Sequence, residues 1–121
     1  MRYLALIHSD ESAWAALPDD ERAAIYARYR AFADDAQATG KLVEGYELKP
    51  TATATTVRVV DGSTVVTDGP FAELREQIAG YFILECESFE EALELAARIP
   101  GASHGAVEVR PGYVDDEELA A

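Results

Sequence analysis

The stretch at residues 51–71, TATATTVRVVDGSTVVTDGPF, decides the fold of this chain. Valine and threonine dominate both of its halves, and these residue types favour β-strands. The pair Asp61-Gly62 between the halves is a strong signal for a tight hairpin turn. We therefore predict a β-hairpin at the centre of the chain, closed by a second turn at Asp68-Gly69-Pro70-Phe71.

Strand-like and helix-like segments flank this hairpin in the order strand, helix, strand on both sides. The first helix opens at Pro18 with acidic residues in its first turn, and Gly40 ends it. Ser88 and Glu91 form a capping-box pattern for the second helix. We predict strands at 3–7, 41–50, 80–87 and 105–111, helices at 18–40 and 88–99, and one helical turn at 72–77.

This order predicts an α+β protein with a ferredoxin-like split βαβ sheet, an inserted β-hairpin and two helices on one face. Helical spacing indicates which residues of each helix face the sheet. These are Ile25, Tyr29, Phe32 and Ala36 in the first helix, and Phe89, Leu93 and Ala96 in the second.

Length and charge narrow the class of protein. The 121 residues fit one domain, predicted at 1–113, with an acidic C-terminal tail at 114–121. Lys and Arg number 10 against 23 Asp and Glu, a formal net charge of −13, which disfavours nucleic-acid binding. The apolar stretch at the N-terminus, before His8, is too short for a signal peptide or a membrane span, and we expect a cytoplasmic protein. The single cysteine, Cys86, is expected to be buried.

The face of the sheet that the helices leave uncovered bears on assembly. The strands at 3–7 and 80–87 are apolar on both faces, so the uncovered face would expose large apolar side chains. A second copy packed sheet to sheet about a two-fold axis would cover them, and we predict a homodimer.

Motifs along most of the chain resemble those of the YCII-related family, in the branch named for its DGPF motif. The resemblance runs from Met1 to about Pro111 and rests on MRYLALIH, ATGKLVEG, TATTVRVVDG, VTDGPFAE, GYFILE, EEALELAARIP and GAVEVRP. It implies a dimeric ferredoxin-like fold, the dimeric α+β barrel. Some small proteins of that kind are cofactor-independent isomerases and monooxygenases.

Two functions follow from the resemblance. The first is binding of a small organic molecule, with cofactor-independent lyase, isomerase or oxygenase chemistry. The second is a non-catalytic accessory or regulatory module, since some members are encoded beside extracytoplasmic sigma factors. Another branch is described as having a His-Asp pair. The matching positions here are Tyr29 and Ile99, so that mechanism is not carried over.

Asp68 and His8 are the candidate catalytic residues. Asp68 can serve as a general base held by a rigid turn. The interpretation that the residue types favour first is that Asp68 is only the Asx turn or helix N-cap of that turn, with Phe71 anchored in the core. His8 ends the first strand on the face of Leu4 and Leu6, where it could act as acid or base near neutral pH or simply bond locally.

Candidate ligand-binding residues are Tyr29, Phe71, Pro70 and Gly69, in a pocket predicted between the sheet and the first helix. The second histidine, His104, is expected in an exposed loop, where a functional role is less favoured. The sequence has no metal-binding spacing, phosphate loop or nucleophile elbow, so we predict no metal and no cofactor. We expect Arg110 to form an ion pair with Glu85 or Glu108.

Overall fold

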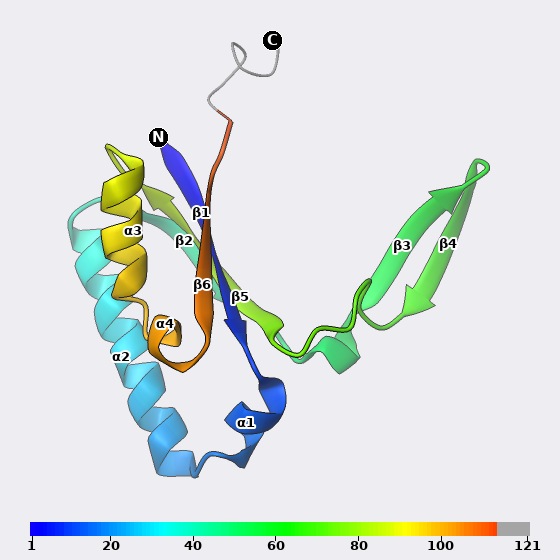
Figure 1. Cartoon of the computed structure of the whole chain (residues 1–121), viewed down its shortest axis with the longest axis horizontal. Coiled ribbons are helices and arrows are strands. Elements are labelled where there is room, and N and C mark those ends of the chain that lie inside the picture. Colours follow the sequence, from blue (N-terminus) through cyan, green and yellow to red (C-terminus); the bar gives the residue numbers. More distant parts are fainter. Residues whose placement is uncertain (114–121) are drawn as a thin grey trace.

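A computed structural model of the chain describes residues 1–113, so the predicted acidic tail lies outside the described residues. The element order begins with a strand and places a hairpin between two strand–helix–strand units (Figure 1). The elements are β1 (Arg2–Ser9), α1 (Glu11–Ala16), α2 (Asp19–Ala38), β2 (Leu42–Glu47), the 3-10 turn η1 (Thr51–Thr53), β3 (Thr55–Val60), β4 (Ser63–Asp68), β5 (Gln77–Glu85), α3 (Phe89–Ala97), α4 (Gly101–His104) and β6 (Ala106–Pro111).

The four-stranded sheet has the order β2-β5-β1-β6, and every neighbouring pair is antiparallel. Two strand–helix–strand units interleave to give this order, and α2 and α3 lie together on one face of the sheet (Figure 1). The predicted ferredoxin-like α+β fold is therefore confirmed. None of the helices in residues 1–113 is long and apolar enough to cross a membrane.

The core lies between the sheet and these two helices. On β1, Tyr3, Ala5 and Ile7 are buried against the helices, while Leu4 and Leu6 between them are only half-buried. Alternation along a strand places Leu4 and Leu6 on the opposite side, which the helices do not cover. We call that side the open face; it consists of Leu4, Leu6, His8, Glu44, Tyr46, Ile78, Tyr81, Ile83, Ala106, Glu108 and Arg110.

The central hairpin forms a separate two-stranded sheet, β3–β4, which we call the arm. Asp61 and Gly62 both have positive φ, 49° and 78°, as the tight turn predicted from their sequence requires. The arm projects from the body on the side opposite α2 and α3 (Figure 1). The predicted hairpin is confirmed, and it is an extension rather than part of the main sheet.

The second helix differs from its prediction in length and in rotation. It ends at Ala97 rather than Ile99, and its buried residues are Ala92, Leu95 and Ala96. Phe89 and Leu93, predicted to face inward, are exposed. Ser88 caps the helix as expected, since its side chain accepts a hydrogen bond from the Glu91 N–H at 3.1 Å.

The segment after the arm also differs from its prediction. Residues 72–76 form no helical turn, and β5 begins at Gln77, three residues earlier than expected. Phe71 is not anchored in the core: 77% of its surface is exposed, and the Arg58 guanidinium lies 5.6 Å from its ring centre.

Candidate functional site

His8 stands near the end of β1 on the open face, where the structure pairs it with a carboxylate. Its Nε2 lies 3.2 Å from Oε1 of Glu108 on the neighbouring strand β6. The bond runs diagonally, because Glu108 is opposite Leu6 and His8 is opposite Ala106. Side chains on one face of adjacent strands come within reach in this way.

Arg110 holds the carboxylate of this pair from the other side. Its Nε donates to Oε2 of Glu108 at 2.7 Å, which confirms one of the two ion pairs expected for Arg110. Arg110, and after it His8, lowers the pKa of Glu108 below its ordinary value. Glu108 is therefore held as a carboxylate that can orient the imidazole and stabilise its positive charge.

The arrangement is suited to proton transfer. When Nε2 of His8 carries its hydrogen and donates it to Glu108, Nδ1 is left with a free lone pair that can accept a proton. The side chain of His8 is 20% exposed, so a ligand on the open face could reach it. His8 was predicted from the sequence but its partner Glu108 was not, because their contact depends on the register of β1 and β6.

Apolar and aromatic side chains adjoin this group on the open face. Leu6 and Tyr81 are cross-strand neighbours, as are His8 and Ile78. The Tyr81 hydroxyl donates to Oε1 of Glu44 at 3.4 Å. A base beside apolar and phenolic side chains is the composition expected of a small organic-ligand site.

Asp68 ends β4 at the root of the arm, and its neighbours hold the turn through backbone groups. The Gly69 N–H donates to the Ala54 carbonyl at 2.8 Å, and the Thr56 hydroxyl donates to the Gly69 carbonyl at 2.8 Å. Within residues 1–113 the Asp68 carboxylate accepts no hydrogen bond, and no helix follows it. The Asx turn or N-cap predicted for Asp68 is therefore wrong.

A shallow hollow of about 320 Å³ lies beside this turn. Pro70 is the one member of the DGPF motif that lines it. The other lining residues are Thr51, Ala52, Ala72, Glu73, Leu74 and Gln77. Gly69 adopts φ 100°, a conformation that favours glycine, and so gives the chain its sharp change of direction. The hollow has a carboxylate, Glu73, but no histidine among these residues.

Tyr29 lies on α2 and points to the other side of the sheet. Its ring stacks on Phe82 in the core, and its hydroxyl lies close to Gly101 at the start of α4. Burial raises the pKa of this phenol. The phenol is thus held in the core at the start of α4, on the opposite face of the sheet from His8.

The predicted pocket between the sheet and the first helix is not formed as expected. His8 lies on the open face, Tyr29 on the helix-covered face, Asp68 at the end of the arm's second strand, and Phe71 just after it. His104 is exposed at the end of the short helix α4, rather than in a loop. Within residues 1–113 no three His, Cys, Asp or Glu side chains are grouped so that they could hold a metal ion.

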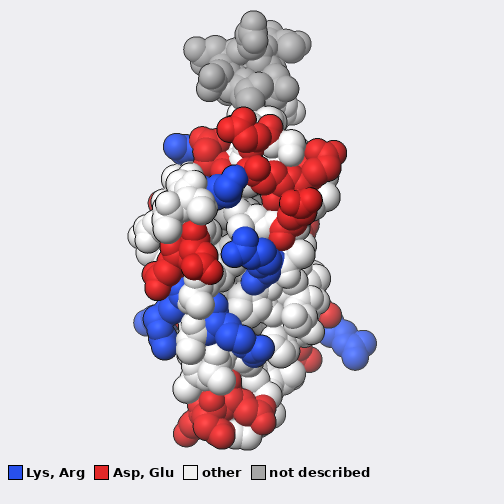
Figure 2. All heavy atoms as spheres, turned by 90° about the vertical axis from the view of Figure 1, so that its left-hand side faces the viewer, with Lys and Arg blue, Asp and Glu red and all other residues white. Residues whose placement is uncertain are grey.

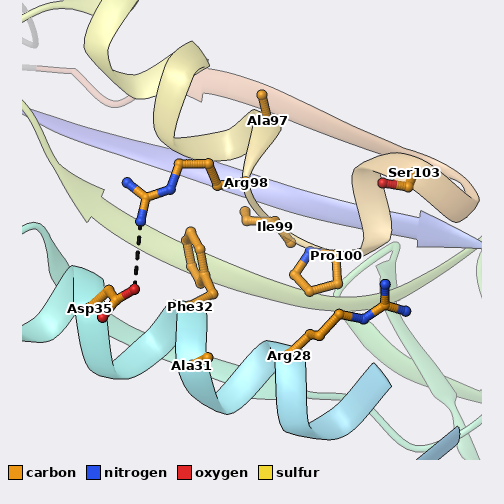
Figure 3. Close-up of a pocket in the computed structure, with 9 residues that line it drawn as sticks. All are labelled: Arg28, Ala31, Phe32, Asp35, Ala97, Arg98, Ile99, Pro100 and Ser103. Carbon is orange, nitrogen blue, oxygen red and sulfur yellow. Dashed lines mark ion pairs between the residues drawn. The ribbon is translucent and has the colours of Figure 1, made fainter. Parts of the chain in front are cut away.

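A second hollow, of about 350 Å³, lies between α2 and the segment joining α3 to α4 (Figure 3). Arg28 and Arg98 flank it, and Arg98 approaches Asp35 at 3.9 Å. On this face basic side chains gather in the middle, with acidic ones above and below (Figure 2). No local sequence pattern indicates this grouping, because Arg28 lies on α2 and Arg98 directly follows α3.

The sequence of this chain has relatives among known proteins. The family model described as YCII-related domain matches residues 1–113. An uncharacterized protein, R00369, of Rhizobium meliloti (strain 1021) is 38% identical over 113 residues, which is 92% of this chain and 91% of that protein.

A solved structure has a similar fold at low sequence identity. It is the 5-chloro-2-hydroxyhydroquinone dehydrochlorinase TftG of Burkholderia phenoliruptrix AC1100, in complex with 2,5-dihydroxybenzoquinone. The TM-score is 0.54 and the identity 16%, over 97% of this chain and 98% of that one. At this identity the likeness supports the fold alone.

Proposed function

This chain belongs to the YCII-related family, and on that premise we propose that it binds a small organic molecule on the open face beside His8. The observation that carries the proposal is the His8–Glu108 pair, 3.2 Å apart, with Arg110 behind the carboxylate. In this site His8 is the acid–base group and Glu108 is the residue that positions it.

The chemistry proposed for this pair is proton transfer that needs no cofactor. Nδ1 of His8 takes a proton from a hydroxyl or an acidic carbon of the ligand, and Glu108 stabilises the imidazolium that forms. The imidazolium then returns the proton at the same or a neighbouring ligand atom. Lyases, isomerases and cofactor-independent oxygenases all use such a proton transfer, so this step does not distinguish among the three classes.

A homodimer is part of the proposal. The open face presents Leu4, Leu6, Ile83 and the half-exposed Tyr81, which a second copy would cover. Covering this face would also exclude water from a ligand held beside His8.

Membership of the DGPF-motif branch is also part of the proposal, and it rests on residues 68–71. The cytoplasmic location likewise remains a prediction from sequence.

The test is a binding titration with 2,5-dihydroxybenzoquinone, the molecule bound by the structurally similar TftG. Wild-type protein and a His8→Gln variant are compared by calorimetry. Glutamine can keep the hydrogen bond to Glu108 through its amide NH₂ but has nothing at the position of Nδ1. We expect the variant to bind at least about tenfold more weakly, as loss of one hydrogen bond with a charged group predicts.

The chain provides a matched control in its only other histidine, His104, which is exposed on α4. The His104→Gln variant should bind like wild type. Wild-type protein without saturable binding, or equal binding by the wild type and the His8→Gln variant, would refute the proposed site. The first of these outcomes would favour the non-catalytic accessory role.

A further inference from the structure

The arm exposes more apolar surface than an isolated hairpin can sustain. Its two strands bond only to each other, and Val57, Val59 and Val66 are largely exposed, Val66 at 62%. A two-stranded hairpin alone is at best marginally stable in water. The arm therefore needs a surface to pack against.

The register of the two strands separates the arm into two unlike faces. Val57 is opposite Val66, and Thr55 is opposite Asp68, so these residues share one face with Val59. We call it the valine face. The other face carries Arg58, whose guanidinium lies over the ring of Phe71.

Asp68 is the single charged residue on the valine face. Its carboxylate accepts no hydrogen bond from residues 1–113, although the backbone around it is well bonded. Any surface that covers Val57 and Val66 also covers the space next to Asp68. The carboxylate would then be directed toward that surface, where a donor is needed to satisfy it.

A second copy of this chain fits the valine face better than the chain's own body. Glu11 on α1 fixes the root of the arm, because its carboxylate accepts from the Thr51 N–H at 2.8 Å and from the Thr51 hydroxyl at 3.1 Å. The arm extends on the same side of the sheet as the open face (Figure 1). A copy packed on the open face therefore lies on the side toward which the arm projects, and two-fold symmetry would make the exchange of arms reciprocal.

We propose that the valine face of each arm packs on the second copy and brings Asp68 to the open face of that copy, next to its His8. This inference rests on the proposed function, and it makes the site a product of two chains. One chain supplies His8 as the acid–base group. The other chain supplies Asp68, whose carboxylate accepts a hydrogen bond from a ligand hydroxyl. A hydroxylated ring is the class of ligand that such a pair would hold.

The interface is tested with two variants on the same strand, Val66→Asp on the valine face and Val65→Asp on the opposite face. Both variants replace an exposed valine by the same charged residue, so any loss of hairpin stability caused by the charge itself should be similar in the two. By sedimentation equilibrium we expect Val66→Asp to raise the dimer dissociation constant at least about tenfold. Val65→Asp should change it less than about threefold. Equal effects, or none, would overturn the proposed interface, and circular dichroism would verify that both variants fold.

The transfer of Asp68 between chains is tested by cross-linking, which needs no ligand. The double variant Asp68→Cys, His8→Cys is treated with a short bismaleimide, and Val65→Cys, His8→Cys is the control. The native Cys86 is buried and should not react. We expect covalent dimers from the first variant and almost none from the second. Linkage within one chain, or equal dimer yields, would contradict the inference.

The two proposals can fail separately. The titration of wild-type protein with 2,5-dihydroxybenzoquinone measures the ligand site, whereas sedimentation and cross-linking measure the arm. A protein that binds the quinone through His8 but gives no cross-linked dimer would retain the proposed function and refute the exchange of Asp68.

Discussion

Leu84 and Leu93 have the same side chain, yet they lie in opposite environments. Leu84 on β5 has no exposed surface, whereas 44% of Leu93 on α3 is exposed. We expect Leu84→Ala to lower the free energy of unfolding by about 2–5 kcal/mol, because it removes buried methyl groups and leaves a cavity. Leu93→Ala should lower it by less than about 1 kcal/mol. Urea unfolding of both variants measures the difference, and similar losses would mean that Leu93 is buried in solution.

Leu93 shows why single residues were harder to predict than helices. Helical spacing identified α3, but it does not determine which side of this helix is buried, because alanine and leucine occur all around it. The predicted stripe of Phe89, Leu93 and Ala96 is one of several possible apolar stripes. The structure buries the stripe of Ala92, Leu95 and Ala96 instead. For α2, Ile25, Phe32 and Ala36 were predicted correctly, because polar residues mark its other side.

At the scale of elements, α1 and the arm are joined by one acidic side chain. Glu11 bonds to both the backbone and the hydroxyl of Thr51, in the 3-10 turn η1 just before the arm, and its own N–H donates to the Gln77 side chain at 2.9 Å. We expect Glu11→Gln to weaken the bond to the Thr51 N–H and so to speed amide hydrogen exchange around Thr51. Mass spectrometry of exchange in this segment measures the effect.

The control for this prediction is Glu21→Gln, which removes the same charge from the first turn of α2. It should leave exchange around Thr51 unchanged. If both variants exchange alike in this segment, Glu11 does not anchor the arm.

Elements with a strong local signal were predicted, and those without one were not. Asp61-Gly62 is a local turn signal, and it located the hairpin correctly. The helix-favouring residues at 72–77 form no helix, and Asp68 does not cap them, whereas the equally short α1 is capped by the Asp10 side chain. The position of Phe71 depended on that helix, so the prediction of a buried Phe71 was wrong for the same reason.

For the whole molecule, the order of elements was sufficient to predict the main sheet. Two strand–helix–strand units with short connections leave few ways to pair, and the observed order is one of them. The candidate site was less predictable, because Glu108 meets His8 only through the pairing of strands from opposite ends of the chain. The orientation of the arm also has no counterpart in local sequence.

Charge acts on the molecule as a whole, and one ion pair offers a test of its pH dependence. The Lys41 ammonium bonds to Glu91 at 2.6 Å, and this bond is the main cause that lowers the pKa of Glu91 in the folded protein. A carboxyl with a lowered folded pKa stabilises the protein fully above its unfolded pKa, about 4.3 for Glu. That contribution is lost as the pH falls through the lower folded pKa.

We therefore expect Glu91→Gln to lower the melting temperature at pH 7 and to come closer to wild type as the pH falls through the lowered pKa of Glu91. Lowering the pH also relieves repulsion in a chain of net charge −13, which would stabilise it. Glu94→Gln on the same helix removes an equal charge without that lysine pair, so it isolates the general effect. Thermal melting from pH 3 to 7 compares the three proteins. If Glu91→Gln and Glu94→Gln give parallel curves, the Lys41–Glu91 pair adds no pH-dependent stability, and repulsion alone governs the acid response.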